Sequence, residues 1–416
     1  MTSTAGAPTF NPFLPAFRDN PYLQYHAVRE RDPVHWAFFG VWLLTRYSDV
    51  VAALRDQRLS ADPRNWEGYK ARYLRGGDEP GPLARFHSKW LLGIDPPDHT
   101  RLRRLAAKAF TPKAIEQMRP DIEQHVARLL DRIEGAETVD AIADLAYPLP
   151  LLVIAEMLGV PTGDIERLKK WSFELNASFD PLMPMEVFRR ANEVVSELTE
   201  YFRRLIAVRR SVPGLDLLSA LIDASDEEDR LSEEELLATC ILLFWAGHET
   251  TVNLLGNGVL TLLRHPAELG RLRRDPELVP SAVEEMLRFE SPVQLTYRSA
   301  LDDLEVQGRV IRKGQQVVLA LGAANRDPAH FPDPDRFDIA RPDNHHVAFS
   351  HGIHFCLGAA LARLQAQTLF RELTQRFPRL ALTAPALTWN PNILVRGLTA
   401  LPVTVGPRHR FGSQTN

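Results

Sequence analysis

The apolar positions along the chain predict a short β region, a long helical region and a second β region. Val34–Trp36 and Val41–Thr45 are apolar runs on either side of a glycine, which predicts a hairpin. Helical periodicity then dominates to about residue 290. Leu304–Gly308 and Val317–Leu321 predict strands that flank a turn at Lys313-Gly314. The pattern therefore predicts a mainly α fold with small β-sheets, of the α+β class.

One predicted helix is much longer than the others. It begins at Ser232, the N-cap residue of an S-E-E-E capping box in which Glu235 is the reciprocal partner, and it ends before Pro266. A helix of this length spans roughly 50 Å, enough to cross a whole domain. The run Leu236–Trp245 is apolar on almost every side, so we expect the helix to be buried. The polar residues that follow exclude a membrane span.

Those polar residues break the rules of helix propensity. The segment Ala246-Gly247-His248-Glu249-Thr250-Thr251 places glycine and two β-branched residues in the middle of the helix. Glycine alone costs about 1 kcal/mol at such a position. A broken rule of this kind often marks a functional site. Alternatively, Glu249 and Thr250 simply satisfy each other or the backbone.

A second cluster of polar residues lies in the predicted helix after Pro280. Glu285 and Arg288 are three residues apart and share one face of that helix. The spacing alone is weak evidence, because a solvated surface pair has the same pattern.

A single cysteine lies in the distinctive segment Phe349–Gly358. Cys356 directly precedes an alanine-rich helix, where free backbone N–H groups and the helix dipole stabilise a thiolate and lower its pKa. Gly352 and Gly358 allow close approach of another group. A zinc site would need further cysteines nearby, which the chain lacks. A nucleophile and an inert core residue remain alternatives.

The composition is that of a globular protein. The chain has 416 residues, 45% hydrophobic and 25% charged, and we expect one domain over 1–416 with irregular tails at about 1–15 and 407–416. A net charge of -4 argues against nucleic acid as a partner. The N-terminus has neither a basic start nor an apolar core, and there are only two cysteines. We therefore expect a cytoplasmic protein without a membrane anchor, and a monomer.

Together these segments resemble the cytochrome P-450 family, from the first hairpin to about residue 406. F-S-H-G-I-H-F-C-L-G resembles the family's haem-binding signature, and A-G-H-E-T-T resembles its oxygen-activation motif. The family's E-x-x-R falls on Glu285 and Arg288, and its third member falls on Arg336. The resemblance implies the cytochrome P-450 fold, with the long helix crossing over a buried haem b. It also implies that Glu285, Arg288 and Arg336 form a structural ion-pair network.

The resemblance assigns chemical roles to particular residues. Cys356 would be the axial thiolate ligand of the iron, which favours O–O cleavage, with Phe349 shielding the sulfur. Glu249 would relay protons and Thr250 would position dioxygen and its water, as the catalytic pair. Basic groups must pair with the haem propionates. The full set of implied cofactor contacts is His99, Arg103, Ala246, Gly247, Arg298, Phe349, Gly352, His354, Cys356 and Gly358, of which Ala246 and Gly247 leave room for dioxygen.

The implied reaction is monooxygenation, with O2 as co-substrate. The substrate would be a hydrophobic small molecule of secondary metabolism, a polyketide or macrolide, steroid, terpene or fatty acid, which is hydroxylated or epoxidised. The expected pocket residues are Leu243, Phe244, Val293, Gln294 and Leu295, with loops near 65–85 and 173–190 closing over them.

Electrons must come from a partner, because the chain has no flavin or iron–sulfur motif. We expect a ferredoxin or flavodoxin, fed by NAD(P)H through a reductase. It would dock on the Cys356 side against the basic residues Arg101, Arg103, Arg104, Lys108 and Lys113. A peroxide-driven peroxygenase and a non-catalytic haem sensor or electron carrier are the alternatives; the Glu249-Thr250 pair disfavours both.

Overall fold

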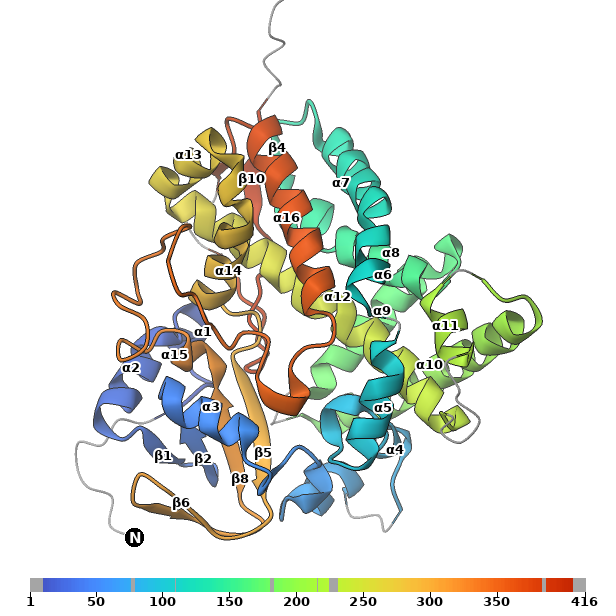
Figure 1. Cartoon of the computed structure of the whole chain (residues 1–416), viewed down its shortest axis with the longest axis vertical. Helices are drawn as coiled ribbons and strands as arrows, with labels where there is room; N and C mark the ends of the chain where they lie inside the picture. Colours follow the sequence, from blue (N-terminus) through green and yellow to red (C-terminus); the bar gives the residue numbers. More distant parts are fainter. Residues whose placement is uncertain are drawn as a thin grey trace, which may run out of the picture.

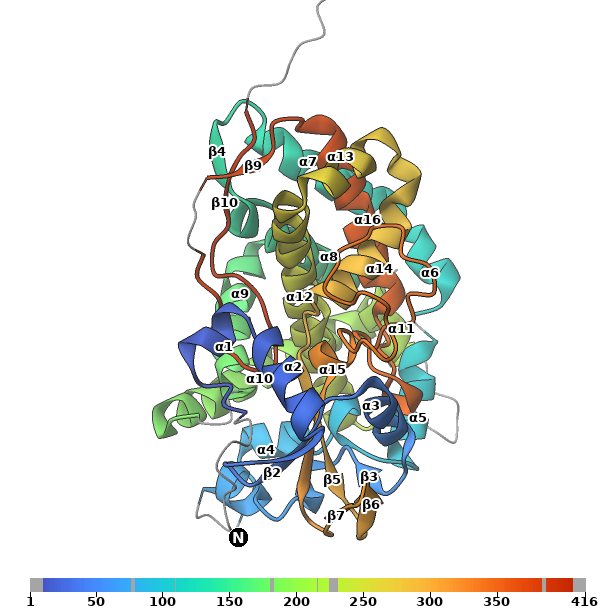
Figure 2. The same ribbon diagram turned by 90° about the vertical axis from the view of Figure 1, so that its left-hand side faces the viewer.

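The long helix α12, Glu233–Arg264, crosses the middle of the molecule in the computed structural model (Figures 1 and 2). Its predicted capping box is confirmed, because the Ser232 hydroxyl accepts the Glu235 N–H while the Glu235 carboxylate accepts the Ser232 N–H. Most of its residues are buried, as the apolar run predicts. The structure describes residues 10–75, 79–108, 110–179, 183–214, 216–223, 231–383 and 387–406.

Helices α8, α10, α14 and α16 pack directly against α12, whereas α1, α2, α3 and α15 lie beside the largest sheet. The helices are α1 Pro15–Asp19, α2 Tyr22–Arg31, α3 Tyr47–Arg55, α4 Pro82–His87, α5 Asp98–Ala107, α6 Pro112–Gln117, α7 Arg119–Ile133, α8 Pro148–Met157, α9 Ile165–Asn176, α10 Met185–Ser211, α11 Leu217–Asp223, α13 Pro266–Arg274, α14 Val279–Phe289, α15 Leu321–Ala324 and α16 Ala359–Arg376. No helix in the described ranges is both long and apolar enough to cross a membrane.

The strands form small sheets beside the helices, at the lower left of Figure 1 and along the C-terminal segment. The largest sheet has the order β1-β2-β8-β5-β3, and β4-β10-β9 form a second sheet. The strands are β1 Val34–Ala37, β2 Val41–Leu44, β3 Leu59–Ser60, β4 Thr138–Asp140, β5 Leu295–Ala300, β6 Leu304–Val306, β7 Arg309–Ile311, β8 Gln316–Ala320, β9 Ala381–Leu382 and β10 Pro402–Thr404.

The predicted hairpin is confirmed as β1 and β2, with Gly40 at φ +79° in its turn. The prediction for the second β region is wrong in one respect. The strand at 304–306 pairs with β7, which the sequence prediction missed, around a turn at Gln307-Gly308. Strand β8 instead joins the large sheet between β2 and β5. The predicted tails at 1–9 and 407–416 lie outside the described residues.

A buried ion-pair cluster fixes the long irregular segment between α15 and α16. Glu285 and Arg288 on α14 are both fully buried and paired at 2.7 Å. The third member is Arg341, whose Nε lies 3.2 Å from both oxygens of the Glu285 carboxylate. Arg288 also donates to three backbone carbonyls, including that of Arg336.

The assignment of Arg336 to this network is therefore wrong. Its side chain is 64% exposed and its guanidinium faces Asp338 at 3.5 Å, so only its carbonyl oxygen takes part. The segment turns after Arg336, and this turn brings Arg341 back to the buried carboxylate of Glu285. The motif spacing could not distinguish the two arginines, because this choice depends on the path of an irregular loop.

We predict that Arg341→Ala lowers the free energy of unfolding by roughly 3 to 5 kcal/mol, because it leaves the Glu285 charge with one buried cation fewer. Arg336→Ala is the matched control and should change it by less than about 0.5 kcal/mol. Chemical denaturation of the two purified variants measures both values. A larger loss for Arg336→Ala than for Arg341→Ala would contradict this assignment.

Candidate functional site

Cys356 lies in a tight loop between a turn of 3₁₀-helix at Gly352–His354 and α16. Its backbone N–H donates to the Phe349 carbonyl at 2.9 Å, and the Gly358 N–H donates to its sulfur. Gly352 has φ +70°, and a Cβ there would lie 2.8 Å from the Leu54 carbonyl of α3. Only glycine therefore allows this loop to rest against α3.

The thiol of Cys356 departs from one expectation. Desolvation raises its pKa above the ordinary value, and this effect exceeds the opposing influences of the Gly358 N–H, Arg103 and Arg363. The N–H of Gly358 at the start of the helix does lower the pKa, as predicted, but desolvation outweighs this contribution. A thiolate at this position needs a further positive charge, and a bound metal ion deprotonates a coordinating thiol outright.

Four predicted cofactor contacts come together beside this loop. The rings of His99 on α5 and His354 are 4.2 Å apart. Arg103 donates to the Phe355 carbonyl at 2.6 Å. Arg298 on β5 is 6% exposed, and its charge lowers the pKa of both histidines. Burial is the main cause for each, leaving pKa values of about 4 for His99 and about 2 for His354.

This cluster has the chemistry of a carboxylate-binding site. Arg298 forms no ion pair within the described part of the chain, and its burial lowers its pKa to about 10. His99 Nε2 is buried without a hydrogen-bond partner among the described residues. A Cβ at Gly358 would meet no described atom within 4 Å, so there is open space beside Gly358, two residues after Cys356. These features fit a haem, whose carboxylates Arg298 and His99 would bind and whose iron Cys356 would ligate.

Glu249 and Thr250 lie on the central helix. Glu249 is 8% exposed, and its Oε1 accepts a hydrogen bond from the Asn176 Nδ2 of α9 at 2.9 Å. Burial raises its pKa to about 7, because no cation pairs with it among the described residues. His248 lies 4.0 Å away but is neutral, since burial lowers its own pKa to about 4. The Thr250 hydroxyl donates to the Ala246 carbonyl at 3.0 Å, which leaves its oxygen free to accept.

The neighbouring polar residues of α12 face other elements. His248 is fully buried, with Nδ1 2.8 Å from the Phe244 carbonyl and Nε2 2.9 Å from the Ser172 hydroxyl. A Cβ at Gly247 would lie 3.0 Å from Ile154 Cδ1 on α8. The structure therefore corrects the role of Gly247, which lets α8 pack closely against α12. Ala246, one helical turn before Thr250, shares the face of that threonine.

Three of the five predicted pocket residues point elsewhere, which corrects the sequence prediction. Phe244 is fully buried against Phe202 of α10 and His248. Gln294 donates to the Ser291 carbonyl at 2.7 Å and to the Tyr22 hydroxyl at 3.4 Å. Leu295 packs in the aromatic N-terminal cluster around Tyr25. Leu295 is the first residue of β5, so strand register decides its orientation, because a shift of one residue reverses the face.

Leu243 and Val293 are both partly buried. Leu243 packs against the main core and Val293 pairs with Val395. The predicted closing loops at 65–85 and 173–190 lie partly outside the described residues, at 76–78 and 180–182.

The sequence analysis missed an aromatic cluster next to Glu249. Trp245 of α12 stacks on Phe179 at 4.1 Å between ring centroids, and Phe179 stacks in turn on Trp90 at 5.6 Å. The His87 ring of α4 stacks on Trp90 at 4.5 Å. Phe179 follows Asn176 by three residues, so the aromatic cluster and the hydrogen-bond partner of Glu249 belong to the same segment of the chain. In the sequence, Trp245 at the end of the apolar run is the residue that could have indicated this cluster.

Comparisons with known proteins agree on one family. A model described as "Cytochrome P450" matches residues 75–383. "Cytochrome P450 107B1" of Saccharopolyspora erythraea is 44% identical and covers 97% of this chain and 100% of its own. "6-Deoxyerythronolide B hydroxylase" of the same organism is 40% identical, covering 93% and 96%. The crystal structure of the myxobacterial cytochrome P450 CYP267B1 in complex with myristic acid is 42% identical, with a TM-score of 0.88 and coverage of 95% and 98%.

The raised pKa of Glu249 predicts a pH dependence of stability. Its ordinary value is 4.5 and its value in the fold is about 7, so between these pH values the folded protein binds more protons than the unfolded chain. Stability from this group is therefore lost as pH rises from about 4.5 to 7, by about 3 kcal/mol in total. Glu249→Gln should remove this loss, while His248 titrates equally in both proteins. The measurement is the free energy of unfolding of both proteins at several pH values. If it changes with pH in the same way in both, the prediction is contradicted.

Proposed function

The chain belongs to the cytochrome P450 family and is a monooxygenase of that family, and on this premise we propose that it inserts one oxygen atom into a hydrophobic small molecule at a haem bound through Cys356. The observation that carries the proposal is the open space beside Gly358, two residues after Cys356, together with the buried cationic group of Arg298. An unpaired buried cation is costly, and a haem propionate is the partner that this site fits.

We assign haem binding to residues on α5, on β5 and in the Cys356 loop. Cys356 supplies the thiolate, with the Gly358 N–H donating to its sulfur. His99 and Arg298 bind the propionates, and Arg103 holds the loop through the Phe355 carbonyl. When bound, the haem supplies the iron at which dioxygen is reduced with two electrons and two protons, so that one oxygen atom enters the substrate and the other leaves as water.

Glu249 and Thr250 would supply those protons. A carboxyl group with a pKa of about 7 is partly protonated at neutral pH, so it both donates and recovers a proton readily. The Thr250 hydroxyl, one turn after Ala246, holds a water for the transfer. A peroxygenase, a sensor or an electron carrier would have no use for this pair, which favours monooxygenation driven by dioxygen.

We propose a substrate that is largely apolar and bulky. The buried aromatic cluster of His87, Trp90, Phe179 and Trp245 lies on the segments that carry Glu249 and its partner Asn176, and apolar aromatic surroundings of this kind suit a hydrophobic ligand. A relative named for hydroxylating 6-deoxyerythronolide B and a neighbour bound to myristic acid support macrolides and fatty acids as classes to test first.

The first test is the carbon-monoxide difference spectrum of the reduced protein beside that of Cys356→Ala. We expect a strongly red-shifted Soret band in the parent, because a thiolate ligand donates electron density to the iron, and its loss in the variant. A folded parent that binds no haem would overturn the proposal. Haem binding with an unchanged band in the variant would remove Cys356 as the ligand.

We further propose that a separate ferredoxin or flavodoxin docks over the Cys356 loop. Arg104 on α5, Lys108 directly after that helix and Lys113 on α6 are exposed, and Ile353 and Phe355 on the loop are 49% and 41% exposed. An apolar centre with a cationic rim suits a small acidic partner. Arg101 is excluded from this surface, because it pairs with Glu235 at the start of α12.

Charge reversal tests this docking surface. In Arg104→Glu with Lys113→Glu, we expect electron transfer from an acidic ferredoxin to slow by about tenfold or more at low salt and to lose its salt dependence, because rim charges control association. Arg189→Glu on α10 is the matched control and should transfer electrons at the parental rate. Equal rates for all three proteins would contradict the assignment.

A further inference from the structure

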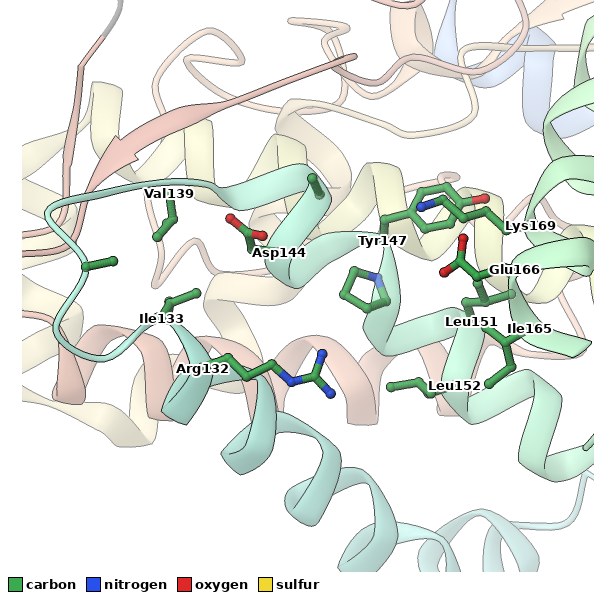
Figure 3. A pocket seen from close by; sticks show the side chains of 13 residues that line it. Arg132, Ile133, Val139, Asp144, Tyr147, Leu151, Leu152, Ile165, Glu166 and Lys169 are labelled. Carbon is green, nitrogen blue, oxygen red and sulfur yellow. The ribbon is translucent and has the colours of Figure 1, made fainter. Parts of the chain in front are cut away.

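A cavity of about 390 Å³ opens to solvent between α7, α8, α9 and the turn that precedes α8 (Figure 3). Charged side chains surround it, namely Arg132, Asp144, Glu166 and Lys169. Tyr147, Pro148 and Leu151 form part of its wall. Figure 3 shows Glu166 and Lys169 beside Tyr147 at one end of the cavity. Its charged lining favours water inside the cavity, because the charged side chains can form hydrogen bonds with that water.

One face of α9 connects this cavity to the buried acid. Glu166, Lys169, Ser172 and Asn176 are spaced by three, three and four residues, so they lie along one side of the helix. The first two are exposed at the cavity, whereas Ser172 and Asn176 are 0% and 5% exposed. Ser172 contacts His248 at 2.9 Å and Asn176 contacts Glu249 at 2.9 Å.

Tyr147 both lines the cavity and contacts His248, the neighbour of Glu249 on α12. Its ring meets the His248 ring edge-on at 6.0 Å, and the Lys169 ammonium lies 4.9 Å from the ring centroid. Burial raises the pKa of its hydroxyl most, and the negative charges of Glu249 and Glu166 raise it further. The phenol is therefore within electrostatic reach of the cavity and of the buried acid.

His248 does not carry protons along this path at neutral pH. Its Nδ1 donates to the Phe244 carbonyl, so its Nε2 accepts from Ser172, and burial lowers its pKa to about 4. It stays neutral and orients the Ser172 hydroxyl. The ionisable groups around Glu249 and the cavity are thus Arg132 on α7, Asp144 in the turn, Glu166 and Lys169 on α9, and His248 on α12, while α8 contributes only apolar side chains to the cavity.

We propose that this cavity is the inlet through which solvent protons reach Glu249, with the Tyr147 hydroxyl and the polar face of α9 as the connecting groups. The proposal rests on the proposed function, because it assigns the proton supply of that reaction. In each transfer the Tyr147 hydroxyl gives its proton toward the Glu249 carboxylate and takes one from cavity water. One proton moves inward, and no electron moves. Tyr147 is a positioning residue, since it acts through Glu249.

Tyr147→Phe tests the hydroxyl alone, because the ring keeps its contacts with His248 and Lys169. We expect the Glu249 carboxyl proton to exchange with deuterium roughly tenfold or more slowly, measured from the carboxylic acid C=O stretch after transfer into heavy water. Glu249→Gln identifies the band. We also expect less product per electron consumed and a larger solvent isotope effect on turnover. A purely structural role would leave the exchange rate unchanged.

Tyr201→Phe is the matched control. Tyr201 also packs against α9, but its hydroxyl donates to Asp164 at 3.0 Å, and its ring contacts Trp171 on another face. This variant should exchange and couple like the parent. Ala143→Trp, which fills the cavity from its rim, should slow exchange as Tyr147→Phe does.

Two outcomes separate this inference from the proposed function. If Tyr147→Phe and Ala143→Trp exchange at the parental rate while the red-shifted carbon-monoxide band is present, the inlet is overturned and the monooxygenase remains. If the parent lacks that band, the proposed function fails. The exchange measurement still decides whether solvent reaches Glu249 by this path.

Discussion

The buried ion pair of Glu285 with Arg288 and Arg341 is the interaction on which the position of the cysteine loop depends. Both members of the α14 pair are fully buried, so each charge must be compensated within the protein. Arg288 does this by donating also to the Asn325 carbonyl at 2.8 Å, and the Asn325 side chain accepts the Val347 N–H at 2.8 Å. The loop that leads to Cys356 begins at Val347, so a salt bridge far from the sulfur determines where this loop starts.

Glu249 shows the opposite treatment of a buried carboxylate. Glu285 has two guanidinium groups and the amide of Asn344 around it, whereas the nearest donor to Glu249 is the neutral amide of Asn176. The Glu285 carboxylate is held by these ion pairs and holds structure. One without them has its pKa raised by burial and can exchange a proton near neutral pH. The same residue type thus has a structural role on α14 and a chemical role on α12.

The features that could be predicted from the sequence are those that local interactions determine. The capping box at Ser232 and the hairpin around Gly40 depend on residues close in the chain, and both are present. Arg341 could not be chosen over Arg336, because the choice depends on how an irregular segment folds back over several residues. Gln294 was assigned to a pocket for the same kind of reason. Its orientation follows from contacts with Tyr22, far away in sequence.

The cysteine site depends on both kinds of information. The motif located Cys356 at the start of α16, and the N–H of Gly358 reaches its sulfur as helix geometry requires. The net direction of its pKa did not follow from that local argument, because desolvation comes from the whole surrounding fold. The cation that would stabilise a thiolate must therefore come from what binds there. Among the described residues Arg298 has no ion-pair partner and His99 Nε2 has no hydrogen-bond partner, and an iron-bearing dicarboxylate would satisfy these needs and that of the thiolate at once.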